Sequence, residues 1–192
     1  MNVSDFFARL SAHPPEAPAL IEARSAVDER ALDYRALLEA VDMLADSLRA
    51  RSVRVLATQL DNGAAWVIAD LAALKAGIAH VPLPLFFTPA QREHALLAAG
   101  ADVLLTADPA RPDVTTQHSR PDAPAVALPP GTAKITFTSG TTATPKGVCL
   151  AAESMFAVAD GLAQALAPLA LKRHLCALPL PVLLENVAGI YA

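Results

Sequence analysis

The sequence predicts an α/β fold in which a layered, mostly parallel sheet is flanked by helices. Helix and strand patterns alternate along the chain, and this order implies right-handed parallel crossovers. Hydrophobic residues make up 54% of the sequence and charged residues 18%, which is a globular composition. A chain of 192 residues is long enough to bury a core.

The first helix and strand have clear local signals. Amphipathic spacing behind a capping Asp33 predicts a helix over 33–50. An apolar run predicts a strand over 53–59. A second apolar stretch, 64–76, is expected to be a helix that Gly77 ends in a left-handed conformation.

The next helix has the strongest start signal in the chain. A short strand is expected over 79–81. Thr88 then stands at a capping position, and Pro89 occupies the first helical position. We expect this helix to end at Gly100 and a strand to follow over 102–106.

Residues 107–131 break this rhythm. They contain six prolines and few large apolar side chains, which predicts a surface loop or linker. Regular structure is expected to return with strands over 134–137 and 148–150, and with a helix over 152–166.

The C-terminal part of the chain is apolar. Residues 174–178 are interpreted as a buried strand and residues 183–192 as a helix. Glu185 and Asn186 are the polar residues of that last stretch, and we interpret them as a helix face that contacts solvent. Because the stretch stops without a cap, a proline or a polar tail, we expect a truncated chain.

Charge and apolar patterning exclude some function classes. The net charge is −4 and the basic residues are scattered, which argues against a nucleic-acid-binding chain. No stretch reaches the roughly 18 uncharged residues that a membrane span needs. The first residues lack the features of a signal peptide. We therefore expect a cytoplasmic protein with no membrane span.

The cysteines and histidines do not suggest a metal site. Cys149 and Cys176 lie in apolar surroundings, so we expect buried thiols in a reducing compartment. None of the five histidines pairs at the i, i+4 spacing of a helix, and only His174 lies near a cysteine, Cys176. Each histidine is interpreted as a surface residue or a hydrogen-bonded core residue.

The chemically informative segment is residues 138–147. It contains two glycines, five hydroxyl side chains and one lysine, and it follows a predicted strand. Glycine lets backbone N–H groups approach anionic oxygens, and hydroxyls add further donors. Lys146 supplies a mobile positive charge. The pattern predicts a phosphate-binding loop; a polar turn between two strands is the alternative.

This loop differs from the Walker A motif, in which Gly-Lys-Ser/Thr opens a helix. Here Pro145 precedes the lysine, Gly147 follows it, and strand-like residues come next. We therefore expect a flexible hairpin that holds phosphates, and not a helix N-terminus.

The order of residues in 138–147 closely resembles the signature loop of the adenylate-forming (AMP-binding) superfamily, Thr-Ser-Gly-Thr-Thr-Gly-x-Pro-Lys-Gly. Residues 32–37, 74–83 and 178–180 are similar to three further stretches of that family, in the same order. The resemblance thus covers nearly the whole chain. It identifies the chain as similar to the N-terminal part of acyl- and aryl-CoA ligases.

The resemblance implies a reaction and its ligands. A carboxylate attacks the α-phosphate of ATP, pyrophosphate leaves, and a thiol takes the acyl group from the adenylate. ATP and Mg²⁺ would be cofactors, CoA a co-substrate, and a small carboxylic acid the substrate. Lys146 and Thr141 would be catalytic. The nucleotide would be bound by Thr138, Ser139, Gly140, Thr141, Thr142, Thr144, Lys146 and Gly147.

The resemblance also implies that residues 1–192 are the N-terminal portion of the AMP-binding domain, without its remainder or its C-terminal lid domain. We expect the fragment alone to be inactive. The start at Met1, with no upstream domain, favours an acid–CoA ligase as the parent. An adenylation enzyme that loads a carrier protein is one alternative, and a non-catalytic nucleotide-binding module is another.

Two positions depart from the family pattern. Ala143 replaces a loop glycine, which would cost about 1 kcal/mol if the position requires a positive φ. Val182 stands where many CoA ligases carry a histidine, and it cannot hydrogen-bond a carboxylate. We expect the acid to be placed differently here.

Overall fold

The computed structural model describes residues 1–23, 28–108, 110–138 and 145–192, with the side chains of 111–114 left out of the description. Six strands form one sheet. They are β3 (Val55–Gln59), β4 (Ala79–Pro82), β5 (Val103–Asp108), β6 (Arg111–Ser119), β7 (Thr132–Thr138) and β8 (Lys146–Ala151). A separate hairpin consists of β1 (Pro18–Ala23) and β2 (Glu29–Asp33).

The sheet has the order β6-β5-β3-β4-β7-β8, and its centre is parallel. Strand β3 pairs in parallel with β4 and β5, and β4 pairs in parallel with β7. The two edge strands are antiparallel to their neighbours, β6 to β5 and β8 to β7. The predicted mostly parallel α/β sheet is confirmed.

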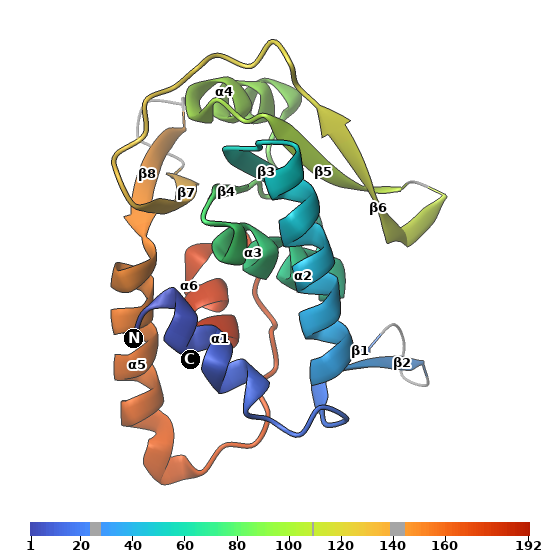
Figure 1. The fold of residues 1–192 in the computed structure, drawn as a ribbon, viewed down its shortest axis with the longest axis vertical. Coiled ribbons are helices and arrows are strands. Elements are labelled where there is room, and N and C mark those ends of the chain that lie inside the picture. Colours follow the sequence, from blue (N-terminus) through green and yellow to red (C-terminus); the bar gives the residue numbers. More distant parts are fainter. Residues whose placement is uncertain (24–27, 109, 139–144) are drawn as a thin grey trace.

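Helices cover both faces of this sheet (Figure 1). They are α1 (Val3–Ser11), α2 (Tyr34–Ala50), α3 (Ala64–Ala76), α4 (Pro89–Ala99), α5 (Ala152–Leu166), the 3-10 turn η1 (Ala167–Leu169), the short α6 (Leu183–Glu185) and the π-helix η2 (Asn186–Tyr191). Alternate residues of β3 face opposite ways, as strand geometry requires. Leu56 joins the larger core with α1, α2, α3 and α5, whereas Val55 and Ala57 pack with α4.

The predicted helix boundaries are confirmed by their caps. The Asp33 side chain accepts a hydrogen bond from the Ala36 N–H at 2.8 Å, and Thr88 forms a capping box with Gln91. Gly77 and Gly100 end their helices in the left-handed region, at φ 72° and 63°. Each of these caps depends on residues that are close in the chain, so the helix ends can be predicted from the sequence alone.

The Pro-rich segment 107–131 is only partly a loop, which corrects one expectation. Arg111–Ser119 forms β6 along β5. An edge strand tolerates Pro112 because one side of its backbone needs no partner, and the pairing resumes at Thr115 after an irregularity. Residues 120–131 contain neither helix nor strand.

The prediction of a buried strand over 174–178 is wrong. The segment has no strand pairing, and Leu175 is 83% exposed. Apolar composition favours burial but carries no information on whether a partner strand is within reach. The expected burial of the thiols fails too, because Cys149 is exposed and Cys176 is half-buried.

The two ends of the chain share one core. Phe6 of α1 packs against Phe156 of α5 and against Tyr191 of η2, with ring centroids 5.2 Å and 5.6 Å away. Figure 1 shows both termini between α1 and α5. Helix α1 and the β1–β2 hairpin were not among the predicted elements. Among the described residues, every helix is too short or too polar to cross a lipid bilayer.

Candidate functional site

The predicted phosphate loop joins β7 to β8, the two strands of an antiparallel hairpin. The register places Thr138, the last residue of β7, opposite Lys146, the first residue of β8. Both flanks of the loop are therefore strands. This confirms the predicted hairpin, in contrast to a loop that opens a helix. The other predicted site residues, Ser139, Gly140, Thr141, Thr142 and Thr144, lie outside the described residues, as does Ala143.

The two described residues at the base of the loop present polar groups. The Thr138 hydroxyl donates to the Lys146 carbonyl at 3.5 Å. The Lys146 side chain is exposed, and among the described residues its ammonium makes no ion pair. An exposed, uncompensated cation can meet an anionic ligand without first breaking an internal contact.

Gly147 allows the hairpin to close tightly. It pairs with Phe137 across the strands. A Cβ at this position would lie 3.2 Å from Ile135 Cγ2 and 3.2 Å from Phe137 Cζ, which is tighter than ordinary contact. The glycine predicted to bind nucleotide thus also has a packing role in holding β7 against β8.

Helix α4 holds the other end of the loop. Pro145 is buried, and its carbonyl lies 3.0 Å from His94 Nε2. Because a carbonyl only accepts, His94 Nε2 carries the hydrogen and donates it. This contact of His94 could not be predicted from the sequence, since partners 51 residues apart leave no local pattern.

A buried polar network anchors β7 beneath the loop. Asp70 of α3 accepts hydrogen bonds from Lys134 Nζ and His80 Nδ1, each at 2.6 Å. It also accepts from Asn186 Nδ2 at 2.9 Å and from the Tyr191 hydroxyl at 2.7 Å. Four elements of the fold, α3, β4, β7 and η2, therefore meet at one carboxylate.

The charges of this network follow from its burial. Burial acts to raise the pKa of Asp70, but the Lys134 charge and the hydrogen bond from His80 outweigh it, so that the pKa is lowered and Asp70 is ionised. Burial lowers the pKa of His80 despite Asp70. A neutral His80 donates through Nδ1 and accepts the Thr58 hydroxyl at Nε2, 2.9 Å away.

The interpretation of Glu185 and Asn186 as a solvent-facing pair is wrong. Glu185 is 6% exposed and Asn186 is 1% exposed. Asn186 bonds to both Lys134 and Asp70, and Glu185 faces His174. Buried polar groups need hydrogen-bond partners. Two polar residues within an apolar stretch therefore indicate a buried polar network, and this pattern could have predicted the contacts of Glu185 and Asn186.

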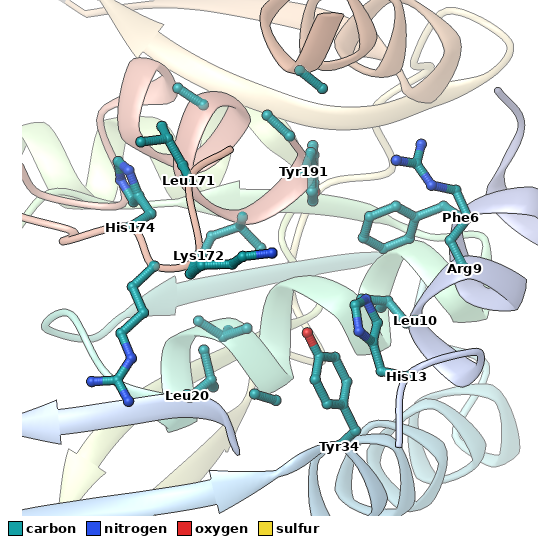
Figure 2. A pocket seen from close by; sticks show the side chains of 18 of the residues that line it. Phe6, Arg9, Leu10, His13, Leu20, Tyr34, Leu171, Lys172, His174 and Tyr191 are labelled. Carbon is teal, nitrogen blue, oxygen red and sulfur yellow. The ribbon is translucent and has the colours of Figure 1, made fainter. Parts of the chain in front are cut away.

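A separate pocket has a volume of about 510 Å³, and Figure 2 shows side chains that line it. Its walls come from α1, α2, the end of α5 and the C-terminal segment, and Arg9, Lys172 and Arg173 supply positive charge. Thr138, Pro145, Lys146 and Gly147 are absent from its lining. The pocket therefore does not extend to the described base of the phosphate loop.

Residues 6–192 match the AMP-binding enzyme family. The chain belongs to that family. Its curated relatives include phosphinothricin tripeptide synthetase PhsC of Streptomyces viridochromogenes, 37% identical over an alignment of 141 residues that covers 62% of this chain and 13% of PhsC. Another is pyochelin synthetase PchE of Pseudomonas aeruginosa, 34% identical over 75% of this chain and 10% of PchE.

Solved structures of adenylate-forming enzymes share the fold. O-succinylbenzoate coenzyme A synthetase MenE of Bacillus subtilis, in complex with AMP, is 25% identical with a TM-score of 0.71 over 95% of this chain and 51% of that chain. The N-terminal subdomain of NpsA from Klebsiella oxytoca is 27% identical with a TM-score of 0.62, over 82% of this chain and 42% of that chain.

This AMP-binding chain spans about half of the MenE chain and 13% or less of the curated relatives that it matches. The fold matches the N-terminal domains of adenylate-forming enzymes.

Proposed function

We propose that this protein takes part in the ATP-dependent activation of a carboxylic acid as an acyl-adenylate. One observation carries the proposal. Within a chain of the AMP-binding family, the β7–β8 hairpin presents an exposed Lys146 opposite Thr138 at the base of a loop rich in glycine and hydroxyl side chains.

The reaction needs charge stabilisation more than covalent chemistry from the protein. The acid's carboxylate oxygen bonds to the α-phosphorus, and the bond to the bridging oxygen of pyrophosphate breaks. Lys146 would stabilise negative charge on the departing pyrophosphate, and Thr138 with the loop hydroxyls would orient it. The conformation of Ala143 and the role of Thr141 remain predictions.

The described hairpin residues suit an anion. Between Thr138 and Gly147 they offer a cation, a hydroxyl and no carboxylate. Mg²⁺ would therefore reach this site with the phosphates of ATP, whose charge it would help to neutralise. Any protein carboxylate that binds it would come from elsewhere in the parent enzyme.

Two thiol acceptors are supported by different observations. CoA, the acceptor favoured by the sequence analysis, has support from MenE, which is named as a coenzyme A synthetase. A carrier protein has support from PhsC, which is named as a tripeptide synthetase and is 37% identical to this chain. The acid substrate is a small carboxylic acid in either case.

The test is acid-dependent exchange of pyrophosphate into ATP by the longest natural protein that contains this chain. A panel of fatty, aryl and amino acids would be compared, followed by CoA or a phosphopantetheinyl carrier protein as acceptor. Exchange with one class of acid supports adenylation. A folded protein that binds ATP but exchanges with no acid would instead be a nucleotide-binding module.

A further inference from the structure

Three potential metal ligands converge at the C-terminal end of the fold, away from the phosphate loop. His174, Cys176 and Glu185 each offer one ligand atom, and these atoms all lie within 4.8 Å of one another. His174 Nε2 is 3.0 Å from Glu185 Oε1. The set combines a nitrogen, a sulfur and an oxygen ligand.

The fold holds these side chains over a glycine. His174 and Cys176 lie two residues apart in a segment without helix or strand, and Glu185 is the last residue of α6. A Cβ at Gly189 of η2 would lie 2.8 Å from His174 Nε2 and 3.2 Å from Cys176 Sγ. Figure 2 shows the His174 ring beside these C-terminal helical turns. The missing side chain at Gly189 leaves room for the cluster.

We propose that His174, Cys176 and Glu185 bind one zinc ion, with water as the fourth ligand. Thiolate, imidazole and carboxylate are the three side-chain ligands that zinc takes in proteins. A thiolate also discriminates against Mg²⁺ and Ca²⁺, which prefer oxygen. The half-exposed His174 leaves one side of the cluster open to water.

Binding requires a small contraction of the cluster. Tetrahedral zinc with bonds of about 2.0–2.3 Å places its ligands roughly 3.3–3.8 Å apart. The ligand atoms here are up to 4.8 Å apart, and since His174 Nε2 and Glu185 Oε1 are only 3.0 Å apart, it is Cys176 that moves inward. Residues 171–177 belong to no helix or strand, so no ladder or helical hydrogen bonds resist this shift. The thiol proton of Cys176 passes to solvent as the zinc–thiolate bond forms.

The ligand set is independent of the proposed adenylation. None of its three residues lies in the β7–β8 hairpin, and the Mg²⁺ of ATP is a hard cation that a thiolate does not favour. Zinc would tie the irregular segment around 174–177 to α6. It would therefore raise the stability of the chain by mass action.

The test is a titration of the metal-free 192-residue chain with Co²⁺, followed by Zn²⁺. We expect one equivalent of Co²⁺ to produce a near-ultraviolet thiolate-to-cobalt charge-transfer band, and Zn²⁺ to abolish it by displacement. Cys176→Ser should lose the band. Cys149→Ser, which removes the exposed cysteine of β8, should retain it.

Affinity provides a second measurement. His174→Gln should weaken Zn²⁺ binding by more than the roughly 10- to 100-fold that loss of an outer partner of a metal ligand costs. Circular dichroism checks that each variant folds; His174 is half-exposed, so its replacement is tolerated even where that of Cys176 is not. Absence of the band in the folded wild-type chain, or its persistence in Cys176→Ser, would overturn the proposal.

Discussion

Lys134 Nζ lies 2.6 Å from the Asp70 carboxylate, and each residue is only 1% exposed. The Lys134 ammonium also contacts Asn186 and lies 3.2 Å from the Tyr191 hydroxyl. Both charges are therefore satisfied inside the core, where an unpaired charge is costly. Since Lys134 belongs to β7, this ion pair fixes the strand that leads to the phosphate loop.

Replacing Asp70 with Asn should be strongly destabilising, because it leaves the Lys134 charge buried and unpaired. We expect a loss of about 3–5 kcal/mol in the free energy of unfolding, measured by urea denaturation. Asp46→Asn removes an exposed partner, 3.0 Å from Arg49 Nη1, and should cost no more than about 1 kcal/mol. Equal losses in the two variants would show that the buried ion pair contributes no more to stability than the exposed one.

Stability should fall as the pH drops below neutrality, because burial lowers the pKa of His80 from its ordinary 6.5. Between that value and the lower pKa of the folded state, the unfolded chain binds a proton that the folded chain does not. The free energy of unfolding then decreases by up to about 1.4 kcal/mol per pH unit.

Urea midpoints at pH 7.5 and 5.5 measure this effect. The His80→Gln variant should lose much of the decrease, and the His13→Gln variant, altered at an exposed histidine, should keep it. A decrease of the same size in wild type and His80→Gln would assign the pH dependence to other groups.

Gly147→Ala should weaken the hairpin. The new methyl group would press on Ile135 and Phe137, and we expect a cost of about 1–3 kcal/mol together with weaker ATP binding. The matched control is Gly161→Ala in the middle of α5, where a Cβ meets nothing within 4 Å. That change should stabilise the chain by roughly 0.5–1 kcal/mol. If Gly147→Ala were neutral, the tight closure would not matter for stability.

Lys146→Ala should slow acid-dependent pyrophosphate exchange by about 100-fold or more, because charge on the leaving pyrophosphate loses its partner. Lys172→Ala removes an exposed lysine that lies outside the hairpin, and it should leave the rate nearly unchanged. Near-normal exchange in Lys146→Ala would refute the assigned role.

Features that depend on neighbouring residues could be predicted from the sequence. Asp33, Thr88, Gly77 and Gly100 mark helix ends through contacts within a few residues, and each does so in the structure. The hairpin form of the phosphate loop follows from the residues on either side of Lys146.

Features that depend on distant residues could not be predicted. Asp70 meets Tyr191 across 121 positions, and Asn186 meets Lys134 across 52. Cys176 and His174 are close in sequence, but their third partner, Glu185, is brought there by the turn into α6. Strand β6 lacks an apolar pattern because it is an edge strand, so its proline and polar residues predict a loop.

Phe6 packs against Phe156 and Tyr191, which are both made much later than Phe6. Helix α1 therefore leaves the ribosome before its ring partners in α5 and η2 do. The lysine that stacks on Phe7, Lys75 of α3, is made earlier than these partners. Helix α1 can thus begin to pack on the helices that follow it, but its aromatic contacts form only after η2 has been synthesised.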